Sequence, residues 1–101
     1  MQLPSEFKCA GNTIKVELVE KTHNNNYGNW CDVTNTITIA KTIELEDKTV
    51  VELTEDQITN TFWHELIHCF QYYFDNSYNE AQSQVYANFL CEYFKSTASD
   101  D

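Results

Sequence analysis

The sequence predicts an α+β domain in which a small, mainly antiparallel sheet is followed by two helices. In the first half of the chain apolar residues alternate with polar ones, as in half-buried strands. In the second half they recur every three or four residues, as in amphipathic helices. The chain has 101 residues, of which 42% are hydrophobic and 14% aromatic, and this length suits one hydrophobic core. We therefore expect a single compact domain over residues 1–101, with a polar tail from about residue 96.

Three strands are expected in the first half, because β-branched and other apolar residues alternate with polar ones there. They lie at residues 13–20, 36–40 and 49–53. The segment 21–32, between the first two, holds an asparagine run and Gly28, which are typical of a loop.

Two helices are expected in the second half. Residues 55–73 contain no glycine or proline, and they follow a capping-box pattern with Thr54 as N-cap and Gln57 at position N3. The second helix is expected at residues 78–95, after a short turn. Its apolar residues Val85, Phe89 and Tyr93 share one face.

The charge of the chain excludes some classes of partner. Sixteen acidic residues against six basic ones give a net charge of −10, which disfavours binding to nucleic acids and to anionic membrane surfaces. No apolar run approaches the roughly 18 residues that span a bilayer. We expect neither a nucleic acid nor a membrane as a partner.

The N-terminus and the cysteines indicate a cytoplasmic protein. Residues 1–8 are polar and lack the apolar run of a secretory signal. The cysteines form no C-x-x-C pair, so a four-cysteine zinc site is not predicted, and reduced thiols are expected. The four are Cys9, Cys31, Cys69 and Cys91.

The segment His64-Glu65-Leu66-Ile67-His68 holds the residues that point to a chemical function. Two histidines four residues apart lie on one face of a helix, with Cβ atoms roughly 5–6 Å apart. Both imidazoles can therefore reach one metal ion at about 2.0–2.1 Å. Glu65 is rotated to the flank of that face, where it can reach a water molecule as a general base. The alternative is a helix with two surface histidines around a solvated glutamate.

A catalytic zinc ion usually has three protein ligands, so one must come from outside this motif. The chain has no histidine after His68, and the downstream candidates are the carboxylates of Asp75, Glu80 and Glu92. We expect Glu80, because it opens the second helix after a turn that could bring it back beside the first.

Two observations compete with the choice of Glu80. Ser77-Tyr78-Asn79-Glu80 is itself a capping-box pattern, in which Glu80 would only cap the helix. A plain helical hairpin would also place Ser83 or Gln84 level with His68, so that Glu80 needs a crossed packing or an irregular turn. Glu80 is still preferred, because glutamine is a rare zinc ligand and an anionic ligand is needed.

Together these residues resemble the minimal gluzincin-type zinc metallopeptidases, which combine H-E-x-x-H with a distal glutamate. In motif and order of elements they are similar to the compact minigluzincins and the ImmA/IrrE-like peptidases of phages and bacteria. The likeness covers residues 12–95 as a pattern, and its specific part is the H-E-x-x-H motif. It implies a Zn²⁺ ion held by His64, His68 and Glu80. Glu65 would be the general base, and the substrate a protein or peptide.

The chain departs from this family pattern in two respects. The segment between His68 and Glu80 is short, and no histidine or tyrosine is assigned to stabilise the transition state. Four tyrosines are candidates for that role, and each could equally be a packing residue. They are Tyr27, Tyr72, Tyr73 and Tyr86.

The reaction expected from this pattern is peptide hydrolysis. Zinc would activate a water molecule and polarise the scissile carbonyl, and Glu65 would carry the proton to the leaving amine. The substrate would lie extended along an edge strand, for which residues 36–40 are a hypothesis. Two alternatives stay open. One is a zinc-binding but catalytically idle regulatory module of phage or mobile-element type. The other is a nucleic-acid-associated protease of the SprT type, whose third histidine and basic extensions this sequence lacks.

Overall fold

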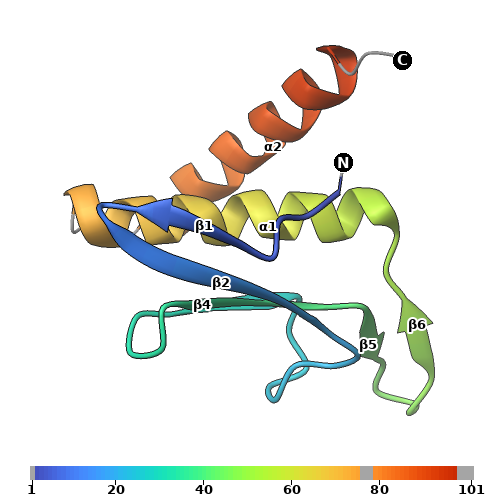
Figure 1. Ribbon diagram of the computed structural model, residues 1–101. Helices are drawn as coiled ribbons and strands as arrows, with labels where there is room; N and C mark the ends of the chain where they lie inside the picture. Colours follow the sequence, from blue (N-terminus) through green and yellow to red (C-terminus); the bar gives the residue numbers. More distant parts are fainter. Residues whose placement is uncertain (1, 76–78, 98–101) are drawn as a thin grey trace.

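The computed structural model of the chain describes residues 2–75 and 79–97. It has the predicted α+β layout, a small and mostly antiparallel sheet followed by two helices (Figure 1). The strands are β1 (Glu6–Cys9), β2 (Asn12–Val19), β3 (Gly28–Cys31), β4 (Thr36–Ala40), β5 (Thr42–Glu44) and β6 (Val50–Glu52). The helices are α1 (Glu55–Phe70), the short π-helix η1 (Gln71–Asp75) and α2 (Glu80–Thr97).

The strand order of the main sheet is β1-β2-β4-β3, and β5 and β6 form a separate two-stranded ribbon. β2 and β4 are parallel, whereas the outer pairs β1–β2 and β3–β4 are antiparallel. After β2 the chain crosses to the outer position of β3 and then returns to β4 in the middle. The hypothesis that residues 36–40 form an edge for a substrate is therefore wrong, because β4 has a partner on each side. Among the described strands of this sheet, the edges are β1 and β3.

The segment 21–32, expected to be a loop, contains the edge strand β3. Its short, mainly polar sequence shows no apolar alternation, so its strand conformation comes from tertiary partners. Backbone pairing with β4 aligns Trp30 with Ile37. The Trp30 ring also lies edge-on to Tyr72 and Tyr73, with ring centroids 6.0 and 6.1 Å apart. The three predicted strands are confirmed as β2, β4 and β6.

The N-terminus of α1 is built as the sequence predicts. The backbone N of Gln57 donates to Thr54 Oγ1 at 3.1 Å, and the backbone N of Thr54 donates to Gln57 Oε1 at 2.8 Å. These reciprocal bonds satisfy two backbone donors at the helix start. At its other end α1 stops at Phe70, earlier than expected, and the chain continues as the wider turn of η1.

The start of α2 differs from the predicted one. Asn79 caps the helix by accepting a hydrogen bond from the backbone N of Gln82 at 2.9 Å, so that Glu80 is the first helical residue. The predicted cap at Ser77 lies outside the described residues. Because Glu80 is not at position N3, its carboxylate does not serve as the reciprocal partner of a capping box.

The core lies between the sheet and α1, and α2 packs on the other side of α1 (Figure 1). Its buried apolar members are Ile14, Ile37, Ile39, Phe62, Trp63, Cys69 and Ala87. Burial raises the pKa of the Cys69 thiol to about 12, and a hydrogen bond with Cys9 adds to this rise. All four cysteines are free thiols.

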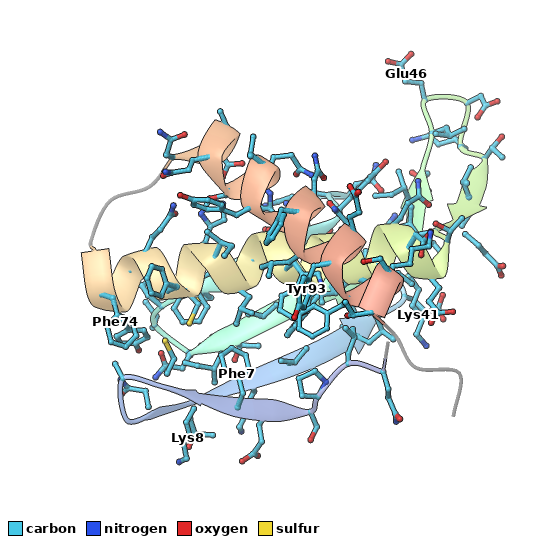
Figure 2. All side chains as sticks on the ribbon, turned by 90° about the horizontal axis from the view of Figure 1, so that it is seen from above. Phe7, Lys8, Lys41, Glu46, Phe74 and Tyr93 are labelled. Carbon is cyan, nitrogen blue, oxygen red and sulfur yellow. The ribbon has the colours of Figure 1, made fainter. Side chains whose placement is uncertain are left out.

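α2 crosses α1 obliquely, as both views show (Figures 1 and 2). It buries the small residues Ser83 and Ala87, whereas Val85, Phe89 and Tyr93 are exposed. Small side chains suit a close helix crossing because they let the two backbones approach each other. In the part of the chain that the structure describes, no helix is long and apolar enough to cross a membrane.

Candidate metal centre

The two histidines of the H-E-x-x-H segment lie one turn apart on α1 and face the same space. Their Nε2 atoms are 3.0 Å apart. The side chains are mostly buried, with exposed fractions of 15% for His64 and 7% for His68. Two nitrogen atoms that converge in this way are half of a typical metal site with imidazole ligands.

Glu80 brings a carboxylate to the same point from the first turn of α2. Its Oε2 lies 3.0 Å from His64 Nε2, and its Oε1 lies 2.6 Å from His68 Nε2. One ligand atom from each of the three residues falls within 4.8 Å of the others. The structure therefore brings together His64, His68 and Glu80, the three candidate ligands predicted from the sequence.

The residue set fits a divalent metal ion. Ligand atoms about 2.0–2.2 Å from a tetrahedral ion lie roughly 3.3–3.5 Å from one another. The observed nitrogen–oxygen distances are 2.6 and 3.0 Å, so an ion would require the side chains to move apart by less than about 1 Å. The carboxylate of Glu80 is exposed, and it can make this movement without disturbing the core.

Of the two other carboxylates considered as ligands, only Glu92 has a described side chain, and it is not part of this cluster. The side chain of Asp75 lies outside the described part of the chain. Glu92 is on α2, about 18 Å further along the helix axis than Glu80 at 1.5 Å per residue, where it lines a different cavity together with Lys95.

A group of side-chain amides holds the other ring nitrogen of His64. Gln84 Oε1 lies 2.9 Å from His64 Nδ1. Gln84 Nε2 donates to Asn60 Oδ1 at 2.9 Å and to Asn88 Oδ1 at 2.8 Å, and Asn60 Nδ2 donates to Asn88 Oδ1 at 3.0 Å. Because this amide orientation presents an acceptor to Nδ1, it favours the tautomer with the proton on Nδ1. The lone pair of Nε2 then faces the cluster, as a metal ligand requires.

The sequence predicts Gln84 beside the first helix only as a competing ligand. Its role as the partner of His64 was missed. The i, i+4 spacing from Glu80 to Gln84, which puts both side chains on one face of α2, is the signal that would have shown it.

Gln84→Leu is expected to weaken metal affinity by roughly 10-fold or more, the usual cost of losing a hydrogen bond to a ligating histidine. Gln84→Glu is the matched control, because it keeps an acceptor for Nδ1 and should stay close to wild type. Competition of each variant with a chelating dye measures the affinity. Equal affinities for Gln84→Leu and wild type would show that the amide group does not position the ring.

Glu65 lies beside the cluster in a buried position, with an exposed fraction of 9%. Burial raises the pKa of its carboxyl to about 7, and the negative charge of Glu80 acts in the same direction, while the charge of His64 opposes it. A carboxyl that titrates near neutral pH can both accept and release a proton, which a general base must do.

Gly28 allows the edge strand β3 to approach Glu65. An added Cβ would lie 2.6 Å from Thr61 Cγ2 and 2.9 Å from the backbone O of Thr38, distances that real Cβ atoms do not show. It would also lie 3.5 Å from Glu65 Cγ. The glycine in the predicted loop is therefore required for close contact between the strand and α1, and not for a turn.

The cluster opens into a shallow cavity of about 450 Å³ between β3 and the two helices. Its lining residues are Asn26, Gly28, Asn29, Trp30, His64, Glu65, His68 and Glu80. The sequence does not predict the contribution from residues 26–30, because this polar segment has the composition of a loop. Of the described elements, β3 therefore supplies the wall of the cavity that faces the candidate metal ligands.

None of the four candidate tyrosines lines this cavity. The Tyr73 hydroxyl donates to Asn35 Oδ1, and the Tyr86 hydroxyl accepts a hydrogen bond from Gln82 Nε2 at 3.1 Å. Tyr27 lines another cavity. Tyr72 packs edge-on against Trp30, which does line the cavity.

No family model, no curated protein and no solved structure matches this chain. Function must therefore be inferred from the residues of the cluster and the surfaces around it.

Proposed function

We propose that the protein is a zinc-dependent peptidase. The observation that carries this proposal is the convergence of two imidazoles and a carboxylate beside a separate, buried carboxyl, Glu65, under an edge strand. The resemblance of the H-E-x-x-H segment and Glu80 to gluzincin-type metallopeptidases supports the same activity. A reducing compartment such as the cytoplasm would suit the chain, because its cysteines are free thiols.

His64, His68 and Glu80 would hold the ion. Zinc is the metal that suits this ligand set best, because it commonly takes two imidazole nitrogens and one carboxylate and leaves a position open for water. When bound, zinc would supply Lewis-acid activation of water and of the scissile carbonyl. Glu65 would accept the proton of the attacking water and pass it to the leaving amine, for which its buried position and raised pKa are suited.

The substrate would bind as an extended strand along β3. This strand is at the edge of the sheet and its residues line the cavity of the cluster. Addition of a peptide strand to such an edge uses backbone hydrogen bonds and orients the peptide across the site. β3 thus replaces residues 36–40 in the original hypothesis.

The proposal is tested with the zinc-loaded protein and a mixture of unstructured peptides of diverse sequence. Mass spectrometry after incubation should reveal new peptide termini. The cleavage should stop on addition of a chelator and return on addition of zinc. Cleavage that survives complete removal of metal would contradict a zinc mechanism.

A zinc-binding but catalytically idle module is the second candidate. The specific observation that favours it is the lack of a tyrosine, or of a histidine other than His64 and His68, among the described residues that line the cavity. Stoichiometric zinc together with no cleavage of any peptide in the mixture would support the idle module over the peptidase.

A further inference from the structure

The pairing of β3 with β4 determines which backbone groups of β3 point to the open edge of the sheet. Tyr27 stands opposite Ala40, and the backbone N of Ala40 donates to the backbone O of Tyr27 at 2.9 Å. Bonded and non-bonded pairs alternate along an antiparallel ladder, so Asn29 belongs to the next bonded pair. The N–H and C=O groups of Gly28 and Trp30 therefore point away from β4, to the side where the sheet ends.

The alternation of side chains along β3 places Trp30 on the face that is turned to the helices. A Cβ added at Gly28 would lie 3.5 Å from Glu65 Cγ on α1, so positions 28 and 30 both face the helices. The Trp30 ring accordingly lies edge-on to Tyr72 and Tyr73 of η1. A peptide strand added to this edge would present every second side chain on the same face, at intervals of about 7 Å. One such side chain would lie beside Gly28 and the cluster, and the next beside Trp30.

The indole of Trp30 offers an apolar surface to that second side chain. Trp30 is half-buried and lines the cavity of the cluster. Its Nε1 is buried and has no hydrogen-bond partner among the described residues, so packing holds the ring in place. Contacts with Tyr72 and Tyr73 supply part of this packing.

The cavity wall formed by residues 26–30 carries no charged side chain. Its two amides bond to each other, since Asn26 Nδ2 donates to Asn29 Oδ1 at 2.9 Å. The acidic residues of the lining are Glu65 and Glu80, and a divalent ion at the cluster would balance their charge. A charged substrate side chain therefore gains no ionic partner from this wall, whereas an apolar one gains contact with the indole.

We propose, on the basis of the proposed binding of a peptide along β3, that Trp30 is a specificity-determining residue. It selects peptides that carry an aromatic side chain at the position beside the indole. Aromatic rings gain from edge-on and offset contacts with each other, in addition to the apolar area that they bury. Aliphatic side chains gain only the second of these two contributions.

The probes for this subsite are short alanine-based peptide hydroxamates with one guest residue. The hydroxamate group chelates zinc and so fixes where each residue of the peptide lies. The guest is phenylalanine, lysine or alanine, placed either next to the hydroxamate or one residue further away. Calorimetric titration of the zinc-loaded protein should show that phenylalanine binds roughly 10-fold more tightly than alanine at one of these two positions. The other position should show no such preference, because neighbouring side chains of a strand point to opposite faces.

Substitution of Trp30 tests whether the indole causes this preference. Trp30→Ala should abolish the preference for phenylalanine, whereas Trp30→Phe keeps an aromatic ring and should retain most of it. Tyr27→Ala is the matched control, because Tyr27 precedes β3 but lines a different cavity, and it should keep the preference. Equal affinities for the three guests in the wild type would overturn the proposal. Tightest binding of the lysine guest, or a preference that survives Trp30→Ala, would overturn it as well.

A measurement on the unsubstituted protein keeps the test decisive if Trp30→Ala alters folding. In the complex with the preferred phenylalanine probe, nuclear Overhauser effects should connect the guest ring to the indole protons of Trp30. Absence of these effects from the complexes with both phenylalanine probes would contradict the assigned contact.

These readouts are independent of peptide cleavage. A preference that depends on Trp30 would support the subsite even if the wild type cleaved no peptide, an outcome that would exclude only the peptidase. Cleavage of peptides together with equal hydroxamate affinities would exclude only the subsite. A zinc-loaded protein that binds none of the hydroxamates would exclude the subsite too.

Discussion

Reconstitution with zinc is expected to give one ion per chain, and His68→Ala is expected to abolish this binding. The physical reason is that the proposed site offers zinc three ligands, and the two that remain in this variant would not hold the ion at micromolar concentration. Elemental analysis after gel filtration measures the stoichiometry. Because zinc binds the folded state preferentially, a chelator should also lower the melting temperature of the wild type and leave that of His68→Ala unchanged.

The third ligand is tested by three substitutions near the start and middle of α2. Glu80→Ala is expected to lose zinc, because it removes the carboxylate that touches both imidazoles. Asn79→Ala removes the helix cap and should cost about 1 kcal/mol of stability while zinc stays bound. Glu92→Ala, on the same helix but away from the cluster, should retain both zinc and stability. Full retention of zinc by Glu80→Ala would exclude this residue as a ligand.

The second large effect is expected for Glu65→Gln, which should keep zinc but lower the rate of peptide cleavage by roughly 10²–10⁴-fold. The amide has almost the same shape as the carboxylate and cannot accept the proton of water. Rates are measured on a peptide that the wild type cleaves, with zinc stoichiometry as the control. A cleavage rate equal to that of the wild type would contradict the role of Glu65 as the base.

The same substitution should change the stability of the metal-free protein in a pH-dependent way. The pKa of Glu65 rises from 4.5 to about 7 on folding, mainly through burial. The folded state therefore favours the protonated carboxyl. Its stabilising contribution is complete below about pH 4.5 and is lost as the pH rises through about 7. Metal-free Glu65→Gln should consequently be more stable than wild type at pH 8, by up to about 3 kcal/mol. The difference should vanish near pH 4 in denaturant titrations.

The position of the two histidines could be predicted from the sequence because it depends on local structure. A four-residue spacing on a helix places His64 and His68 on one face whatever the rest of the chain does. The capping box at Thr54 and Gln57 likewise joins residues only three apart. Both features formed as predicted, since they need no distant partner.

The edge strand β3 and the buried face of α2 were decided by tertiary structure alone. The polar segment that holds Gly28 becomes a strand because β4 offers it backbone partners and because Trp30 packs against tyrosines some forty residues away. α2 exposes its larger apolar residues and buries Ser83 and Ala87. Apolar periodicity predicts that the face with Val85, Phe89 and Tyr93 is buried. The close crossing with α1 instead buries the face of α2 that carries small side chains.

The candidate metal cluster depends on both the sequence and the tertiary structure. Composition and motif limited the third ligand to three carboxylates, and the preference for Glu80 followed from ligand chemistry. Whether Glu80 or Gln84 lies at the ligating nitrogens depends on the angle at which α2 crosses α1. That angle arises from packing between residues distant in sequence. The sequence by itself therefore determined the α1 half of the centre, and the helix crossing placed Glu80 at the Nε2 atoms and Gln84 at the Nδ1 atom of His64.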